Sequence, residues 1–290
     1  MLTLHFAPPR RSRRSHDEEG VEVWRDHQGT IVAWGYIEGD DHWMCWPRLA
    51  DFHFDRANAR VTAHAADAID RLALIDLFHR SVVPMALQCR GIQVLHASAV
   101  ATADGVVAFA GSSGSGKSTL AVAVAQGGRD SRRVWCDDGF VFHAIGDQVV
   151  TMEMPFRSRL LPDAAAHLGR TASKNARVWA EDDITARIGE RRRIAAICEL
   201  LPSNESGECR ITPLSPSSGL LRLLTHAYAF TVREPSVRRM MFDSYAQLTA
   251  TVPILQLTFP RGLDRLDELA GTLLRDILRI SPEHARAEAR

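Results

Sequence analysis

The stretch Gly111-Ser-Ser-Gly-Ser-Gly-Lys117-Ser118-Thr119 decides how the rest of this sequence is interpreted. It fits the phosphate-binding pattern G-x-x-x-x-G-K-[ST] at every position. The apolar run from Gly105 to Ala110 before it predicts a buried strand, and residues 120–125 after it predict a packed helix. Glycines in such a loop let successive backbone N–H groups point at phosphate oxygens, and the helix N-terminus adds partial positive charge. This setting favours a phosphate site over a chance match in a Gly/Ser-rich linker.

The pattern gives the residues of this loop separate tasks. Lys117 is expected to reach the β- and γ-phosphates of a nucleotide, and Ser118 to place its hydroxyl on Mg²⁺. The predicted nucleotide-binding residues are Gly111, Ser112, Ser113, Gly114, Ser115, Gly116, Lys117, Ser118 and Thr119.

Composition indicates an ordinary globular protein. The 290 residues are 46% hydrophobic and 24% charged, which is typical of chains that bury a large core. Thirty-five basic residues balance thirty-five acidic ones, so no overall field favours nucleic acid or an anionic membrane as a partner. No apolar run approaches the length needed to cross a bilayer, and we expect no membrane partner.

The cysteines and the N-terminal basic run bear on the compartment. Five widely spaced cysteines form no C-x-x-C pair, so they predict neither a disulfide framework nor a zinc site. The basic run Arg10 to Arg14 is followed by acidic residues where an export signal would need an apolar segment, which favours a frayed basic terminus. A reducing, cytoplasmic location is the simplest expectation.

The N-terminal part reads as a small antiparallel sheet. Residues 21–54 alternate apolar and polar positions in short pieces. Four of the six tryptophans lie here, namely Trp24, Trp34, Trp43 and Trp46. They indicate either the core of a small sheet, which is the commoner case, or a peptide-binding surface. Residues 65–87 then show helical spacing, and Pro84 predicts a kink or the end of that helix.

Candidate catalytic residues flank the phosphate loop on both sides in the sequence. Residues 91–100 predict a strand that carries His96, and Asp104-Gly105 predicts a tight hairpin into the strand before the loop. Antiparallel pairing through this hairpin would bring His96 toward the phosphate end of the sheet. The alternative for His96 is a buried histidine bonded to the backbone.

An acidic pair follows the loop. Asp137 and Asp138 lie in a predicted strand over residues 134–143, which a second strand at 148–153 follows. Near a phosphate loop, one carboxylate can hold Mg²⁺ while the other accepts the proton of an attacking hydroxyl. The alternative is an acidic turn, because Asp-Asp-Gly is good turn chemistry.

The last third of the chain predicts two strands and two helices. The strands are expected at 194–201 and 253–259, and the helices at Ser215–His226 and 263–280. Four leucines of the first helix are expected to point inward, namely Leu220, Leu221, Leu223 and Leu224. Between the acidic pair and this region, one or two of seven cations are expected to meet phosphate: Arg157, Arg159, Lys174, Arg177, Arg191, Arg192 and Arg193.

These motifs together resemble a known family. The order of His96, the loop and the Asp137-Asp138 pair leading into a hairpin is similar to the C-terminal catalytic domain of HPr kinase/phosphorylase and its relatives. Residues 193–201 and 219–227 resemble a later core strand and a helix of such proteins, so the resemblance covers roughly residues 87–259. The phosphate-loop pattern alone is shared by many families, whereas the strand with His96 and the acidic pair make the match to this family more specific.

The resemblance implies a fold and a division of the chain. The fold is α/β, with a mixed sheet core that carries the phosphate loop and is flanked by helices, preceded by a small N-terminal antiparallel β subdomain. The implied parts are a β-rich subdomain with a basic flexible terminus (1–63), a connecting helix (64–87), an HPr kinase-like ATP-binding catalytic domain (88–280) and a polar tail (281–290).

The resemblance also implies an activity and roles. Family members transfer the γ-phosphate of ATP to a serine of a protein, which implies ATP and Mg²⁺ as cofactors and a peptide or small protein as the substrate. Asp137 is implied to take the proton of the substrate hydroxyl, with His96 as a helper near the transferred phosphate. Lys117 is implied to hold the nucleotide, and Ser118 and Asp138 the metal. Positioning and charge neutralisation are most of what such a transfer needs.

Departures from the family matter too. The glycine-rich signature loop of bifunctional HPr kinase/phosphorylases is not recognised here, so a reverse phosphorylase activity is not implied. A short N-terminal sheet ahead of such a core resembles the standalone kinases of lasso-peptide biosynthesis, which phosphorylate the C-terminal serine of a precursor peptide. The alternative functions are a small-molecule kinase and a nucleotide-gated regulatory module. The sequence is also compatible with a homo-oligomer.

Overall fold

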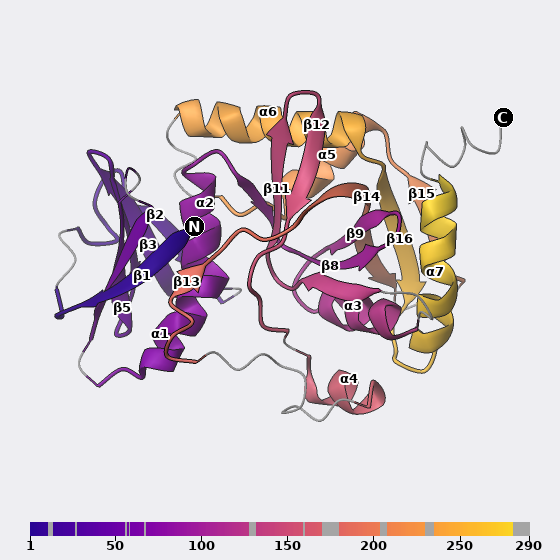
Figure 1. The fold of residues 1–290 in the computed structure, drawn as a ribbon, viewed down its shortest axis with the longest axis horizontal. Helices are drawn as coiled ribbons and strands as arrows, with labels where there is room; N and C mark the ends of the chain where they lie inside the picture. Colours follow the sequence, from indigo (N-terminus) through magenta and orange to yellow (C-terminus); the bar gives the residue numbers. More distant parts are fainter. Residues whose placement is uncertain are drawn as a thin grey trace. The chain divides into compact units, whose positions relative to one another are not determined.

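The computed structural model describes eleven stretches of the chain, which form two compact units (Figure 1). The first unit contains residues 1–93, 178–188 and 228–241, and the second contains residues 94–177, 189–227 and 242–290. The stretches described are 1–10, 14–26, 28–55, 57, 59–66, 68–127, 132–158, 160–169, 180–203, 208–229 and 235–280. The predicted tail at 281–290 lies outside them, as do Arg159, Lys174 and Arg177. The predicted domain boundaries at 63 and 87 stay predictions.

The first unit is built on a seven-stranded sheet with the order β13-β1-β6-β5-β4-β3-β2. Its strands are β1 (Leu2–Ala7), β2 (Glu22–Arg25), β3 (Ile31–Glu38), β4 (Asp41–Trp46), β5 (Ala50–Asp55), β6 (Arg60–Ala65) and β13 (Thr185–Ala186). The pairs from β2 to β6 are antiparallel, as predicted, but β1 runs parallel to β6. The antiparallel sheet predicted for residues 21–54 is therefore confirmed, whereas the N-terminal subdomain as a whole is mixed, because residue alternation does not encode strand direction.

Two of the tryptophans form a small core on this sheet. Trp43 is buried with Tyr36 and Cys45, and Trp34 packs against the same cluster. The ring of Trp43 also stacks on His53, with the ring centroids 4.6 Å apart. Trp43 is thus a core residue, the commoner of the two predicted cases, while Trp24, Trp34 and Trp46 are half-buried.

The helical segment of the first unit contains a wide turn. It consists of α1 (Arg71–Leu77), the π-helix η1 (Phe78–Val82) and α2 (Val83–Gln88), and the Asp70 side chain caps its start by accepting from the Leu72 N–H. The π turn ends where the Val83 N–H donates to the Phe78 carbonyl. Pro84, which lacks an N–H, follows directly, in the first turn of α2. Of the two alternatives predicted at Pro84, a kink or an end, the end is wrong, since the helix continues to Gln88.

The second sheet has nine strands, and the longest lies in its middle. Seven follow the order β10-β8-β9-β14-β12-β11-β7, while β16 pairs with β14 and β15 with β16. The strands are β7 (Gln93–Leu95), β8 (Ala97–Thr102), β9 (Gly105–Ala110), β10 (Arg133–Cys136), β11 (Phe140–Ile145), β12 (Gln148–Met152), β14 (Arg191–Ser203), β15 (Arg210–Pro213) and β16 (Ile254–Pro260). Strand β14 is parallel to β9 and β16 and antiparallel to β12. The sheet is therefore mixed, as predicted.

The predicted hairpin before the phosphate loop is confirmed. Strands β8 and β9 are antiparallel and close with Thr102 opposite Gly105. The single strand predicted over 134–143 is wrong, because the chain bends at residues 137–139 and passes from β10, which pairs with β8, to β11, which pairs with β12. Asp138 has a left-handed backbone, with φ of +64°, which ends an extended strand. The acidic pair thus lies in a turn, which is the alternative that the sequence Asp-Asp-Gly had indicated.

Helices cover this sheet and complete its core. The helices are α3 (Lys117–Gln126), α4 (Pro162–His167), α5 (Pro216–Leu224), α6 (Pro235–Thr251) and α7 (Leu266–Ile280). Apolar residues of α3 and α7 pack with β8, β9, β14 and β16 in one cluster (Figure 1). Ser215 caps α5 as predicted, yet Leu221 on this helix is 70% exposed, so the expectation that it points inward is wrong. No helix in the described stretches has the length and apolar character to span a bilayer.

We expect Leu273→Ala to destabilise the protein by roughly 2–5 kcal/mol, because Leu273 is 1% exposed in the core between α7 and the sheet. Leu221→Ala is a matched control on an exposed helix position and should change the free energy of unfolding by about 0.5 kcal/mol or less. Urea unfolding followed by circular dichroism measures both. Equal shifts in the two variants would contradict the core assignment.

Candidate functional site

The phosphate loop connects β9 to α3 in a conformation that depends on its glycines. Gly114 and Gly116 have φ of +76° and +94°, which L side chains rarely adopt. At Gly111 a Cβ atom would lie 2.7 Å from the Ser115 hydroxyl oxygen, so space as well as backbone conformation excludes a side chain. The Ser115 N–H donates to the Ser112 carbonyl over 3.1 Å, which closes the turn. The backbone of the loop therefore requires glycine at these positions.

Two donors of the loop fit a phosphate group. The Ser115 hydroxyl is buried, lines the cavity above the loop and has no hydrogen-bond partner among the described residues. The Lys117 amine is also buried and donates to the carbonyls of Gly111 and Ser112 over 2.9 and 3.1 Å. Burial lowers the pKa of Lys117, while the charges of Asp138 and Asp137 act to raise it. An anion at the loop would supply the acceptor that both groups can use.

Ser118 at the start of α3 joins an oxygen cluster with Asp137. One carboxylate oxygen of Asp137 accepts hydrogen bonds from Ser118 over 2.7 Å and from Ser98 on β8 over 2.6 Å. Hydroxyl and carboxylate oxygens are ligands that Mg²⁺ prefers, and a nucleotide-bound Mg²⁺ needs only one or two of them beside the phosphates. No group of three or more His, Cys, Asp or Glu in the described stretches is arranged to hold a metal.

Asp138 is directed to a different partner. Its carboxylate lies 3.7 Å from Nε2 of His96, and both side chains are about one-third exposed. His96 itself lies between β7 and β8, where its backbone N–H donates to the His226 backbone carbonyl over 2.8 Å. The interpretation of His96 as a buried histidine is therefore wrong. His96 and Asp138 both line the cavity.

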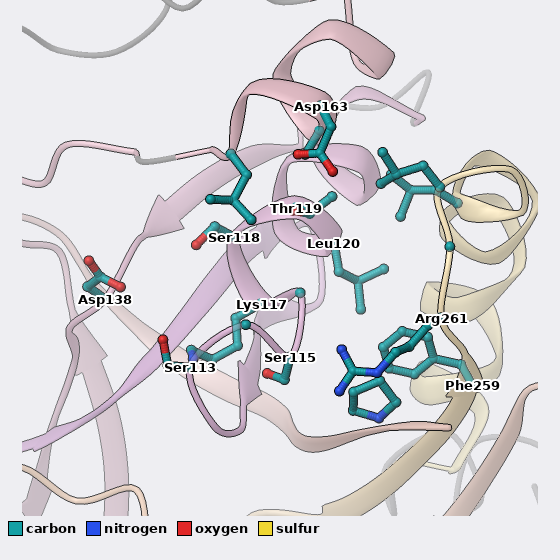
Figure 2. A pocket seen from close by; sticks show the side chains of 18 of the residues that line it. Ser113, Ser115, Lys117, Ser118, Thr119, Leu120, Asp138, Asp163, Phe259 and Arg261 are labelled. Atoms are coloured by element: carbon teal, nitrogen blue, oxygen red, sulfur yellow. The ribbon is translucent and has the colours of Figure 1, made fainter. Parts of the chain in front are cut away.

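The cavity has two distinct ends, with the loop between them (Figure 2). Its volume is about 460 Å³. Asp138 lies on one side of Lys117, and Phe259 and Arg261 lie on the other. Seven of the nine predicted loop residues line it, namely Ser113, Gly114, Ser115, Gly116, Lys117, Ser118 and Thr119. The structure thus brings together His96, the loop and the acidic pair, while their roles stay predictions.

The cations predicted to meet phosphate can be located only in part, and those in the described stretches do not line this cavity. Of the seven candidates, Arg157, Arg191, Arg192 and Arg193 lie in the described stretches, and none of them lines it. Arg192 instead pairs with Glu190 over 3.3 Å. Arg261, which the sequence reasoning did not single out, extends into the cavity from the turn after β16.

Sequence reasoning also missed Ser98 and a buried charge cluster. Glu199 on β14 is 3% exposed and lies opposite Ala110, the residue before the loop. One carboxylate oxygen lies 3.5 Å from Nε2 of His226 and 3.7 Å from Arg222, and the other has no hydrogen-bond partner among the described residues. A lone acid in an otherwise apolar strand was the signal for Glu199. Ser98 gave no such signal, because a bend at His96 interrupts the strand pattern and the contact of Ser98 with Asp137 forms only in the folded chain.

Comparisons with known proteins add little to this geometry. The sequence matches no family model and no curated protein. Solved structures do match, among them the Hpr(Ser) kinase/phosphatase from Coxiella burnetii, with 13% identity over 63% of this chain and 95% of that chain, and a TM-score of 0.33. The family that the sequence resembles is thus among the structural matches, but a likeness of this degree assigns neither the fold nor the function.

We expect the pKa of His226 to lie below its ordinary value of 6.5, because burial disfavours the charged ring more than Glu199 stabilises it. Lys117 and His96 lower it further. The native state then binds fewer protons here than the unfolded chain, so this residue reduces stability as the pH falls below 6.5.

Glu199→Gln removes the negative charge and should lower the pKa of His226 further. NMR titration of the histidine rings measures both values, with His226→Gln to assign the signal. A higher pKa in Glu199→Gln than in the wild type would contradict the assignment.

Proposed function

We propose that this protein is an ATP-dependent kinase that transfers the γ-phosphate to a serine hydroxyl of a peptide or small protein. One observation carries the proposal: the acidic pair after β10 is split, with Asp137 bound to Ser118 of the loop and Asp138 beside His96 at the cavity. A nucleotide switch needs only the first carboxylate. A second carboxylate at the cavity adds a group that can accept a proton from a hydroxyl.

The loop and its neighbours would hold the nucleotide phosphates. Lys117 would exchange the two carbonyl contacts of its amine for phosphate oxygens, and Ser115 would donate its buried hydroxyl. Ser118 and Asp137 would hold Mg²⁺, which when bound supplies positive charge against the transferring phosphate. Ser98 would keep the Asp137 carboxylate in place, since it donates to the same oxygen as Ser118.

The contacts favour roles for the two aspartates opposite to those that the family resemblance implies. Asp137 is buried and shares a carboxylate oxygen with the Ser118 hydroxyl, which is a metal-side arrangement. Asp138 lines the cavity and is the carboxylate that a substrate hydroxyl can reach. In the transfer the acceptor oxygen forms a bond to the γ-phosphorus, the bond to the leaving ADP oxygen breaks, and Asp138 takes the hydroxyl proton. His96 would orient the Asp138 carboxylate.

The two roles predict different defects. Asp138→Asn keeps a residue that tolerates a left-handed backbone, and it should lower kcat roughly 10²- to 10⁴-fold while ATP binding changes little. Asp137→Asn should instead weaken Mg²⁺-dependent ATP binding. Calorimetry with and without Mg²⁺, combined with initial rates, separates the two. A lower kcat at unchanged Mg²⁺-dependent binding in Asp137→Asn would restore the roles that the resemblance implies.

The activity itself is tested with labelled ATP, Mg²⁺ and serine-containing acceptors. We expect phosphoserine on one acceptor from a panel of HPr and precursor peptides with a C-terminal serine, and none with Lys117→Ala. Mass spectrometry of the acceptor locates the phosphate. ATP binding without phosphoserine on any acceptor would overturn the serine kinase. A partner bound only with ATP would then favour a regulatory module, and label on a small hydroxyl compound a small-molecule kinase.

A further inference from the structure

The end of the cavity away from Asp138, here called the apolar end, holds large apolar side chains beside Arg261 and Asp163. Phe259 at the end of β16 and Leu263 in the following turn line it, and Leu161 before α4 also lines the cavity. Leu120 of α3 and Leu266 of α7 close it from the core side, since both are buried and both line it. Figure 2 shows Phe259 and Leu120 on the same side of the loop, opposite Asp138. The phosphate loop thus lies between a polar end and an apolar end.

We infer that this apolar end is the subsite for the planar base of the nucleoside triphosphate. The inference rests on the proposed function for the phosphates and extends it to the rest of the ligand. A nucleotide with its γ-phosphate toward Asp138 must extend its base away from Asp138, and this end of the same cavity lies there. The total volume of about 460 Å³ falls within the range of small-molecule sites.

The exposure of the apolar residues supports a ligand of this kind. Leu161 is 67% exposed, although it directly precedes a helix whose Ala164 and Ala165 are buried. Phe259 is half-buried, so part of its ring is also open to solvent. An aromatic base between these side chains would remove apolar surface from water, and base stacking on an aromatic ring adds to this. A peptide would instead need backbone partners, which these side chains do not provide.

Arg261 lies at the same end of the cavity as Phe259. Its backbone N–H donates to the Ser203 carbonyl over 2.9 Å, which fixes the turn after β16. Gly262 follows with φ of +135°, and a Cβ there would lie 2.4 Å from Asp264, so the turn requires glycine. The Arg261 side chain extends from this turn into the cavity (Figure 2). Its guanidinium would meet the phosphates next to the sugar, whereas Phe259 would contact only the base.

Binding of ATP and of inorganic tripolyphosphate, each with Mg²⁺, tests the subsite. Tripolyphosphate has the phosphates and lacks the base. Phe259→Ala should weaken ATP binding roughly 5- to 100-fold and leave tripolyphosphate binding unchanged. Leu161→Ala, at an exposed position that the fold does not depend on, should weaken ATP binding a few-fold with the same selectivity. Phe259→Leu keeps an apolar side chain and should fall between Phe259→Ala and the wild type.

Leu221→Ala is the control, because this exposed leucine lies on α5 and does not line the cavity. Isothermal titration calorimetry gives the affinities, and circular dichroism checks the fold of each variant. Equal weakening of ATP and tripolyphosphate, or unchanged ATP binding in both Phe259→Ala and Leu161→Ala, would overturn the base subsite while the phosphate site stands. Failure of the wild type to bind either ligand would overturn the proposed function as well.

Discussion

The site depends on one carboxylate oxygen that two hydroxyls share. Asp137 accepts from Ser98 of β8 and from Ser118 of α3, so this buried oxygen joins a strand, a helix and the bend after β10. Each donor satisfies part of a charge that would be costly to bury alone. The same contacts fix where the bend begins, and therefore which way the next residue faces. Asp138 is directed to the cavity and His96 because Asp137 is held in the interior.

The sequence predicted the parts of this site that rest on local chemistry. The loop pattern, the turn at Asp104-Gly105 and the cap at Ser215 each involve residues close in the chain, and the structure has the expected form at all three. The direction of one strand relative to another depends on residues far apart in the chain, so the parallel pairing of β1 with β6 was not predicted. The sequence Asp-Asp-Gly fits either a strand or a turn. The chain turns here because β10 pairs with β8 whereas β11 pairs with β12. Glu199 and His226 meet only through tertiary packing, so no pattern could pair them.

Strand β14 holds these elements in register. It pairs with β9 over the residues that lead into the loop and with β16 over those that lead to Phe259. The loop and the apolar end of the cavity are thus attached to neighbours of the same strand, within the second unit. Glu199 lies on this strand where both pairings overlap. A change in the register of β14 would move the loop, the buried acid and the apolar end together.

The short connection between β8 and β9 bears on how the site assembles. Its two strands are neighbours in the chain, and such hairpins close within microseconds, whereas the pairing of β9 with β14 must close a loop of roughly ninety residues. The hairpin that carries Ser98 and leads into the phosphate loop is therefore expected to form early, and the charge cluster of Glu199 late. During folding, the phosphate-binding half of the site would exist before the strand that completes its surroundings.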